Sequence, residues 1–286
     1  MKNNISEVLM LAIVTGANSG MGKATVSALA DKGYEVIMLC RNEKRGMDAF
    51  TSLKSENPDR NLELMLCDLG SFASIRAFAD SFTKKGKRID LIINNAGFIS
   101  LDRQLTDDGF ERQFGVNHLG HFLLVNLLLP FMDKGSRIVV VASGAHKAGK
   151  IHFDDINLTR GYNVVKAYGQ SKLANVLFTR ELAKRLAARK ITVNCCHPGA
   201  VATNMGVDRE TGFGKTITGM LKPFFLTPEE GAKTAVFLAT DPSVKSVTGG
   251  YFYKCKVAKS SRASRNKALA KRLYGFSEEL TKIKEQ

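Results

Sequence analysis

The sequence predicts an α/β fold, in which a doubly wound and mostly parallel sheet carries helices on both faces. Short apolar runs alternate with helical patterns along the whole chain. The apolar runs are nearly continuous, as in strands that are buried on both faces of a parallel sheet. The 286 residues contain no repeat, low-complexity segment or linker. We therefore expect a single domain, 1–286, with about seven parallel strands.

The predicted elements follow one another in a regular order. The strands are expected at residues 8–15, 34–40, 62–68, 89–97, 136–143 and 191–199, with a last one near 249–255. The helices between them are expected at residues 21–33, 42–56, 71–85, 109–132, 163–186 and 227–240. This alternation is typical of crossover units that build a parallel sheet.

The formal net charge is +15, from 42 basic and 27 acidic residues. Such an excess can attract nucleic acid, anionic membranes or anionic metabolites. Much of it lies in residues 255–286, which we expect to form a basic, solvated, amphipathic helical tail; contact with a membrane surface is the alternative. No aromatic platform or nucleic-acid motif accompanies this charge, so nucleic acid is not an expected partner.

The chain shows no sign of export or of a membrane span. No apolar run reaches roughly 18 residues, and the apolar run near the N-terminus has no small-residue cleavage site. We expect a soluble, cytoplasmic protein without a transmembrane segment. The cysteines are odd in number and form no CxxC pair, so we expect free, mostly buried thiols in a reducing compartment. They are Cys40, Cys67, Cys195, Cys196 and Cys255.

The first predicted strand runs into the segment TGANSGMG, which places Gly16, Gly20 and Gly22 before the first helix. Glycines permit a tight turn and let the backbone approach a pyrophosphate, while the helix N-terminus offers free N–H groups. A glycine pattern alone is weak, because turns use glycine in any case. Its position between a first strand and a first helix indicates a nucleotide site.

The end of the second predicted strand reads VIMLCRNEKR. Cys40 and Arg41 stand where NAD-binding folds carry an acidic residue for the ribose hydroxyl. Arg41 could clamp a 2′-phosphate, with Lys44 or Arg45 adding charge, so NADP(H) is favoured over NAD(H); a solvent-exposed arginine is the alternative. Asp68 closes the third strand. It could accept a hydrogen bond from the adenine amino group or cap the next helix, a role that Ser71 could also fill.

Tyr168 and Lys172 lie four residues apart in the segment YGQSK, within a predicted helix. Residues with this spacing share a helix face. A lysine ammonium favours the phenolate form, so we expect it to lower the phenol pKa from its usual value near 10. The pair could be a tuned proton donor, or simply two surface residues.

From Ile13 to about Tyr253 the motifs together resemble the short-chain dehydrogenase/reductase family, which has a Rossmann-like fold. The motifs are TGANSGMG, NNAG (94–97), VNHLGHF, VVVASGAH, YGQSK and HPGAVAT (197–203). The resemblance implies a catalytic tetrad of Asn117, Ser143, Tyr168 and Lys172. It also implies cofactor contacts from Gly16, Asn18, Ser19, Gly20, Met21, Gly22, Arg41, Asp68, Leu69, Asn95, Ala96, Gly97, Tyr168, Lys172, Pro198, Gly199, Val201 and Thr203.

The segments CRNEKRG, GVNHLGHFLL and KIHFDDIN are most similar to the retinol dehydrogenase and WW-domain oxidoreductase branch. Many retinol dehydrogenases carry an N-terminal membrane anchor, whereas this sequence starts close to its first strand, which argues against a retinoid substrate and a membrane location. Residues 203–227 resemble the substrate lid of the family; a packed surface loop is the alternative. Apolar side chains of this lid, including Met205 and Phe213, would form a substrate pocket, so we expect an apolar aldehyde, ketone or alcohol.

The resemblance also implies a mechanism. Ser143 and Tyr168 would both contact the substrate, and the Ser143 hydroxyl would hold its carbonyl oxygen. Tyr168 would donate a proton as hydride arrives, Lys172 would stabilise the phenolate, and Asn117 would hold a relay water. An epimerase or dehydratase is one alternative, although the C-terminal segment is too short for the substrate domain of such enzymes. A catalytically silent NADP(H)-binding regulatory or scaffold protein is another, although such proteins tend to lose the tyrosine or lysine.

The histidines are weighed separately. His118 and His121 lie three apart on a predicted helix, but no third ligand stands at a matching spacing, so no metal is expected. His146 could line the substrate entrance or be a loop residue, and His197 is expected to be structural. The resemblance further implies a homodimer or homotetramer, in which helix 163–186 and the apolar face of residues 117–132 pair across a two-fold axis.

Overall fold

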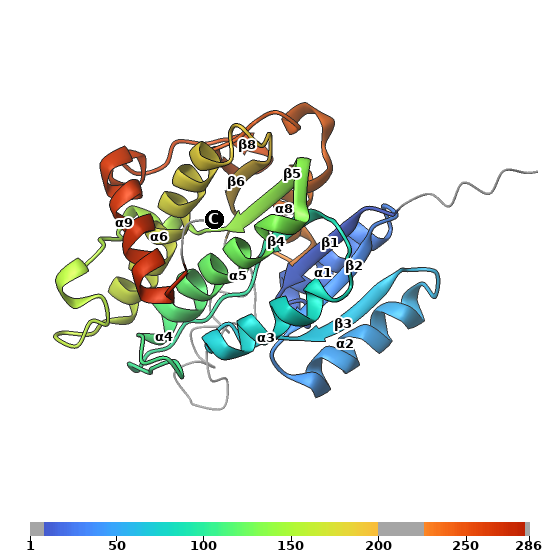
Figure 1. Ribbon diagram of the computed structural model, residues 1–286, viewed down its shortest axis with the longest axis horizontal. Helices are drawn as coiled ribbons and strands as arrows, with labels where there is room; N and C mark the ends of the chain where they lie inside the picture. The colour runs from blue at the N-terminus through green and yellow to red at the C-terminus, as the bar shows by residue number, and fades with distance from the viewer. Residues whose placement is uncertain (1–8, 200–225, 284–286) are drawn as a thin grey trace, which may run out of the picture.

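The computed structural model describes residues 9–199 and 226–283, which contain an eight-stranded sheet in the order β3-β2-β1-β4-β5-β6-β7-β8 (Figure 1). Strands β1 to β7 are parallel, as the sequence predicts. The eighth strand, β8, was not expected; it spans Lys256–Val257 and pairs antiparallel with β7. Two residues are too few for an apolar pattern to reveal a strand.

The elements have the following bounds. The strands are β1 Leu11–Thr15, β2 Glu35–Cys40, β3 Leu62–Leu66, β4 Ile89–Asn94, β5 Met132–Val141, β6 Thr192–His197 and β7 Tyr251–Tyr253. The α-helices are α1 Gly20–Ala30, α2 Glu43–Glu56, α3 Phe72–Thr83, α4 Arg112–Phe114, α5 Gly120–Leu128, α6 Val164–Arg185, α8 Pro228–Thr240 and α9 Lys267–Thr281. A π-helix, η1 Gly115–Leu119, joins α4 to α5, and 3₁₀ turns include η3 Gly144–Lys147.

Helices cover both faces of the sheet. Alternate residues of a strand point to opposite faces, and β2 shows this directly. Its Ile37 and Leu39 pack with the aromatic side chains of α3, α5 and α6. Its Val36 and Met38 pack instead with apolar residues of α1, α2 and α8. Each face therefore has its own core, and the carboxyl ends of the parallel strands meet at one edge between them.

The helical region expected at 109–132 is interrupted. Its α-helix begins at Arg112, passes through the π-helix η1 and ends in a 3₁₀ turn at Leu129–Phe131. By length and composition the stretch Arg112–Phe131 could cross a membrane, but 67% of its most apolar window is buried inside the protein. We interpret it as a core helix of this fold.

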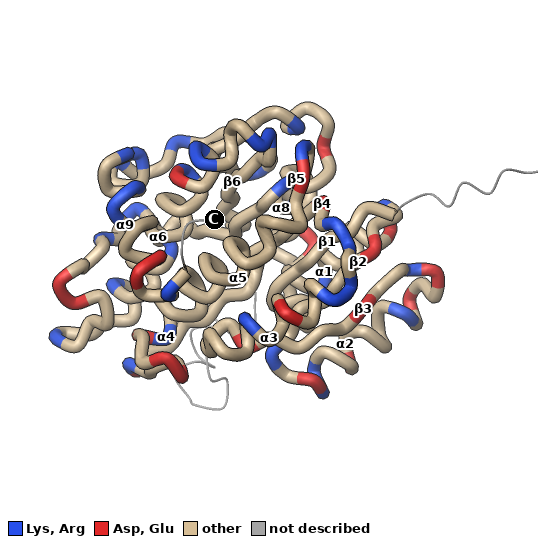
Figure 2. The backbone as a smooth tube through the Cα atoms, in the orientation of Figure 1, with Lys and Arg blue, Asp and Glu red and all other residues tan. Residues whose placement is uncertain are grey.

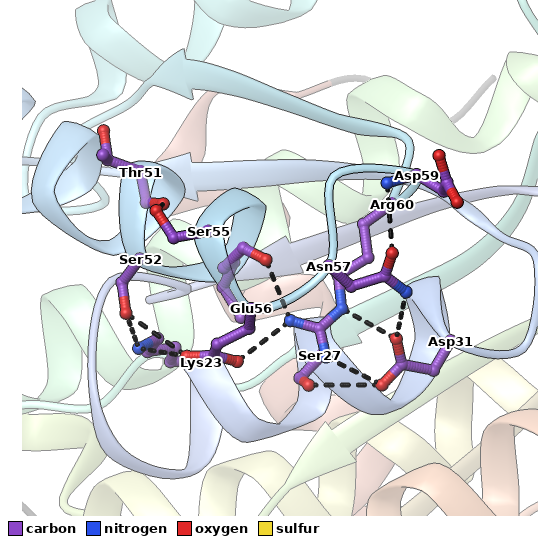
Figure 3. A network of polar contacts seen from close by, with 11 residues as sticks. Lys23, Ser27, Asp31, Thr51, Ser52, Ser55, Glu56, Asn57, Asp59 and Arg60 are labelled. Carbon is purple, nitrogen blue, oxygen red and sulfur yellow. Dashed lines mark hydrogen bonds and ion pairs between the residues drawn. The ribbon is translucent and has the colours of Figure 1, made fainter.

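A polar network fastens α1 to the end of α2, and its centre is Arg60 (Figure 3). The Arg60 guanidinium donates to both carboxylate oxygens of Asp31, at 2.7 and 2.9 Å, and to Glu56 at 3.0 Å. It also donates to the Leu53 carbonyl at the end of α2. These contacts lower the pKa of both carboxyl groups. The network holds α1, whose N-terminus forms part of the site described below.

All five cysteines are free, as expected, and all but Cys255 are buried. Burial raises the pKa of Cys40 to about 11 and those of Cys67 and Cys195 to about 12. The same cause raises the pKa of Cys196. These thiols are packing residues of the core.

The basic C-terminal segment forms the expected amphipathic helix, α9, but this helix is not a solvated tail. Figure 1 shows α9 lying beside α6, and Figure 2 shows Lys and Arg along α9 and the chain that leads into it. Leu273 and Tyr274 are buried against the neighbouring helices, whereas Lys267 and Lys271 are exposed. The apolar face is therefore docked, and only the charged face meets solvent.

Candidate active site

The glycines after β1 form a tightly closed turn. Gly16 adopts φ +64°, which favours glycine. A Cβ on Gly22 would lie 2.1 Å from the Gly16 carbonyl oxygen, so a side chain cannot fit there. Within the described chain the Ser19 side chain makes no capping hydrogen bond to α1. The first amide groups of this helix are therefore available to an anion, which fits a dinucleotide pyrophosphate.

A cavity of about 140 Å³ adjoins this turn, at the carboxyl ends of β1, β2, β3 and β4. Its lining brings together many of the residues expected to bind the cofactor. They are Gly16, Asn18, Arg41, Asp68, Leu69, Ala96 and Gly97, joined by Thr15, Leu39, Cys67, Phe98 and Val116. A larger groove of about 670 Å³ between α1 and α8 is lined by none of the four expected catalytic residues.

The basic residues and the possible helix caps near this cavity differ in their contacts. Arg41 lines the cavity, whereas Lys44 forms an exposed ion pair with Asp48 at 3.2 Å. Asp68 accepts the Gly70 N–H at 2.8 Å, while the Ser71 side chain caps α3. The sequence did not decide whether Asp68 or Ser71 caps this helix, and the structure shows that Ser71 does.

Thr15 organises the turn that follows β4. Its hydroxyl oxygen accepts the N–H groups of Asn95 and Ala96, both at 2.9 Å. The Asn95 side chain returns to the β1 end and donates to the Thr15 carbonyl at 2.8 Å. This network fixes the NNAG turn beside the glycine turn, so both line one edge of the sheet.

Ser143, Tyr168 and Lys172 lie close together at the end of β5. Ser143 caps η3, and its Oγ accepts the Ala145 N–H at 3.2 Å. The Lys172 ammonium lies 5.5 Å from the centre of the Tyr168 ring and donates to the Val141 carbonyl at 3.1 Å. That carbonyl is two residues before Ser143, so strand β5 and helix α6 together position all three groups.

The environment changes the pKa of both titratable groups. Burial lowers the pKa of Lys172 to about 8. Burial also raises the pKa of Tyr168, and a hydrogen bond with the Ser143 side chain only partly opposes this. The lowered Tyr168 pKa expected from the neighbouring ammonium is thus wrong, because burial of the phenol raises its pKa and the Ser143 hydrogen bond does not offset this.

Asn117 sits in the π-helix η1 and is fully buried. Its side chain accepts the Phe98 N–H at 2.7 Å and donates to the Phe98 carbonyl at 2.9 Å. It also donates to Ser171 Oγ at 3.1 Å, and that hydroxyl donates to the Tyr168 carbonyl. Asn117 therefore connects the segment after β4 to the helix that carries Tyr168.

The two histidines of the possible metal pair point to different partners. His118 Nε2 lies 2.9 Å from Ser277 Oγ in α9, whereas His121 contacts Thr15 Oγ1 at 2.8 Å. No group of three or more potential metal ligands occurs within residues 9–199 and 226–283. Burial lowers the pKa of His118 to about 3 and that of His121 to about 4, so both are neutral at physiological pH.

His146 and His197 support the end of β5. His146 Nδ1 lies 2.6 Å from the Ser143 carbonyl, and its Nε2 accepts the Ser261 N–H at 3.1 Å. His197 Nδ1 accepts the N–H groups of Gly144 and Gly199, both at 3.3 Å. The structural role expected for His197 is confirmed, and His146 is a buried support rather than an entrance residue.

Some expected site residues lie outside the described chain. These are Val201, Thr203, Met205 and Phe213, with nearly all of the expected lid at 203–227. Pro198 and Gly199 are described and follow β6 directly, with Gly199 at φ +95°. Conversely, sequence reasoning missed the contacts of Thr15, Phe98 and His121. The threonine before the glycine turn was a visible signal, whereas the other two depend on tertiary packing.

Comparison with known proteins gives consistent results. A family model described as short chain dehydrogenase matches residues 10–212. Retinol dehydrogenase 14 of Mus musculus is 42% identical over 285 residues, covering 95% of this chain and 85% of the relative. Retinol dehydrogenase 13 of Homo sapiens is 42% identical over 277 residues, covering 94% and 83%.

Solved structures share the fold. An uncharacterized protein from Mycobacterium Paratuberculosis matches with a TM-score of 0.77 and 34% identity, covering 96% of this chain and 93% of that one. An actinorhodin polyketide ketoreductase solved with NADPH matches with a TM-score of 0.68 and 25% identity, covering 85% and 95%. The family model, the relatives and the sheet order agree, and we conclude that this chain belongs to the short-chain dehydrogenase family, is similar to retinol dehydrogenases, and is an oxidoreductase acting on CH–OH donors.

Proposed function

We propose that the chain is an NADP(H)-dependent oxidoreductase that interconverts an apolar aldehyde or ketone and its alcohol, with Tyr168 as the acid/base. The observation that carries the proposal is the meeting of a serine hydroxyl, a phenol and an ammonium at the carboxyl end of β5, on the same edge of the parallel sheet as the glycine turn after β1. Such donors can stabilise the charge that grows on a carbonyl oxygen as it is reduced.

Each side chain has a distinct task in this proposal. Ser143 Oγ accepts the Ala145 N–H and hydrogen-bonds with the Tyr168 side chain, and in our proposal its proton would be donated to the substrate oxygen. The raised pKa keeps Tyr168 protonated at neutral pH, which is the state needed to give a proton to that oxygen. Lys172 stabilises the phenolate that remains. The buried Asn117 amide holds the segment after β4 against α6, and Asn117 would bind the water that returns the proton.

The cofactor supplies the hydride, and this chain supplies its binding site. The first amides of α1, between Ser19 and Gly22, would hold the pyrophosphate. Asp68 would accept from the adenine. Asn95, Ala96, Pro198 and Gly199, with Val201 and Thr203, would line the nicotinamide side. Arg41 would bind the 2′-phosphate, which favours NADP(H) over NAD(H).

The substrate class is supported by the relatives, which are named retinol dehydrogenases. Their name points to a long apolar alcohol or aldehyde, and Met205 and Phe213 would contact it in our proposal. Retinal therefore belongs on the first panel of substrates, with steroids, quinones and simple aldehydes. A cytoplasmic location and a homo-oligomeric state stay predictions.

The decisive experiment compares Tyr168→Phe with the intact chain. NADPH consumption over the carbonyl panel should fall on the order of a hundred-fold or more, while NADPH affinity stays unchanged because the ring remains. The matched control is Tyr162→Phe, which removes a tyrosine hydroxyl that donates to the Ser100 carbonyl and does not belong to the proposed catalytic group. Turnover by Tyr168→Phe close to that of the intact chain would contradict the acid/base role. NADPH binding without turnover of any carbonyl would favour a silent regulatory protein.

A further inference from the structure

His146 connects two segments of the chain that lie far apart in the sequence. It is 0% exposed, and its Nδ1 lies 2.6 Å from the Ser143 carbonyl oxygen. Its Nε2 accepts the backbone N–H of Ser261, 115 positions away, at 3.1 Å. A backbone N–H can only donate, so Nε2 carries no proton and we assign the ring proton to Nδ1. In this neutral tautomer Nδ1–H donates to the Ser143 carbonyl, and both ring nitrogens are satisfied.

The amide that selects this tautomer is itself held in place. The Ser261 hydroxyl accepts the Ser264 N–H at 3.2 Å, and the Ser261 carbonyl accepts the Ser264 hydroxyl at 2.8 Å. The preceding Ser260 is buried, and its hydroxyl accepts from the Arg180 guanidinium of α6 at 3.2 Å. The segment between β8 and α9 therefore presents the Ser261 N–H to His146 from a fixed position.

The carbonyl that His146 holds belongs to the turn that carries the serine hydroxyl. Ser143 is the cap residue of η3, and its side chain hydrogen-bonds with that of Tyr168. The chain just after this turn packs directly on α6, since a Cβ on Gly149 would lie 2.2 Å from the Gly169 carbonyl oxygen, next to Tyr168. The turn is thus fixed at its far end by this close contact and at its start by the bond from His146, which together set where the hydroxyl lies relative to the phenol.

The surroundings of the ring keep it neutral. Burial is the largest cause that lowers the pKa of His146; the bond to the Ser143 carbonyl opposes it, and the positive charges of Lys147 and Arg180 lower the pKa further. A protonated ring would direct an N–H at the Ser261 N–H, so charging His146 would break the connection. The titratable groups packed around the ring come from four elements: Lys147 of η3, Arg180 of α6, His197 of β6 and Tyr251 of β7.

We propose that His146 is a positioning residue, which the Ser261 amide holds in one tautomer and which thereby fixes Ser143 for its work on the substrate oxygen. The inference rests on the function proposed above for Ser143. Both nitrogens of His146 are bonded within the protein, so it acts through Ser143 and not on the substrate itself. The segment that precedes α9 thereby takes part in the site through His146.

Two substitutions separate the two bonds of His146. His146→Asn carries an amide nitrogen close to the place of Nδ1, so it can donate to the Ser143 carbonyl but cannot reach Ser261. His146→Gln can reach the Ser261 N–H with its amide oxygen but leaves the Ser143 carbonyl without that donor. Each variant loses one buried hydrogen bond, so Tm should fall by a similar amount in both.

Turnover should separate the two variants that stability does not. The kcat for carbonyl reduction should fall roughly ten- to a hundred-fold in His146→Gln, because the serine is misplaced. It should stay close to that of the intact chain in His146→Asn, and NADPH affinity should be unchanged in both. The matched controls are His152→Asn and His152→Gln, because His152 is only half-buried and bonds to Gln170 through its backbone N–H. Both controls should keep their turnover.

The same change made in a Ser143→Ala chain shows whether His146 acts through the serine. In that chain the hydroxyl is already gone, so adding His146→Gln should lower kcat by no more than about two-fold further. If His146→Gln caused its full loss of kcat in the Ser143→Ala chain as well, its role would be structural only, and the inference would be overturned.

The tautomer can be read without any turnover. With isotopically labelled histidine, NMR of the intact chain at neutral pH should show His146 as a neutral ring protonated at Nδ1. A ring protonated at Nε2, or a charged ring, would overturn the inference, and this measurement applies even if His146→Gln does not fold. Full turnover by His146→Gln, or a loss of turnover that follows Tm equally in both His146 variants, would overturn it as well. Full turnover by Ser143→Ala would instead overturn the proposed function of the serine, whatever the tautomer of His146.

Discussion

The hydroxyl of Thr15 lies 2.8 Å from Nε2 of His121, and this pair joins the end of β1 to α5, directly after the π-helix that carries Asn117. His121 Nδ1 faces the Asn117 carbonyl at 3.1 Å, so we assign the ring proton to Nδ1. Nε2 then accepts the Thr15 proton, while the Thr15 oxygen accepts two amides of the NNAG turn. Every polar atom of the pair is satisfied, and the pair couples two parts of the site.

The coupling can be measured with a double-mutant cycle on Thr15→Val and His121→Leu. Each single change leaves a buried polar partner unsatisfied, so each should lower the free energy of unfolding by about 1–3 kcal/mol. The double variant should cost clearly less than the sum, because it removes both partners together. Urea denaturation measures all four proteins. Strictly additive losses would mean that the two side chains do not interact.

Arg41 should decide the choice between the two nicotinamide cofactors. Arg41→Ala removes the proposed partner of the 2′-phosphate, so the Kd for NADPH should rise roughly ten- to a hundred-fold, from a charge-assisted contact of about 1.5–3 kcal/mol. The Kd for NADH should hardly change. Lys44→Ala is the matched control, since Lys44 pairs with Asp48 at an exposed position. Equal affinity of the intact chain for NADH and NADPH would refute the role of Arg41.

The pH dependence of carbonyl reduction should report Lys172. Burial lowers its pKa to about 8, so the ammonium is present below that pH and is lost above it. Tyr168, with its raised pKa, keeps its proton over the same range. We therefore expect kcat/KM for reduction to be level at lower pH and to fall as pH rises through about 8. Lys172→Arg should move the fall to higher pH, because a guanidinium stays charged. If kcat/KM of the intact chain stayed constant at pH values well above about 8, the assignment to Lys172 would be ruled out.

Arg60 should contribute stability that depends on acidity. Its contacts lower the pKa of Asp31 and Glu56 in the folded state. A carboxyl group whose pKa is lowered by folding stabilises the fold at pH values above its pKa in the unfolded chain, which is near 4. That stability is lost as the pH falls through the pKa of the folded state. Arg60→Met should lower Tm at neutral pH and should flatten the decline of Tm in acid. Lys44→Met, at a surface pair, should change neither the Tm at neutral pH nor its decline in acid. If Tm declined in acid equally steeply in Arg60→Met and Lys44→Met, the result would count against the network.

The sequence predicts the parts of the fold that local patterns encode. The apolar runs give β1 to β7 within a few residues, and the glycines at 16 and 22 mark a turn whose geometry excludes side chains. These signals are local, because a strand buried on both faces must be apolar and a closed turn must lack Cβ atoms. The same local logic places Ser143, which follows a strand, at that edge, whereas the meeting of Tyr168 with Ser143 was expected only from the family resemblance.

Other features depend on contacts between distant residues and leave no local pattern. Thr15 and His121 are 106 positions apart, and only the packing of α5 on the sheet brings them together. The docking of α9 likewise depends on which helices lie beside it. The direction of the Tyr168 pKa shift could not be read from its spacing to Lys172, because the burial that raises this pKa depends on tertiary packing.

The distribution of the thiols has a practical consequence for labelling. A thiolate is the reactive form of cysteine, and four of the five side chains are shielded from reagents and hard to ionise. Cys255, at the bend between β7 and β8, is the partly accessible one. A maleimide dye should therefore attach at that bend alone, giving a singly labelled protein for fluorescence work with every native cysteine retained.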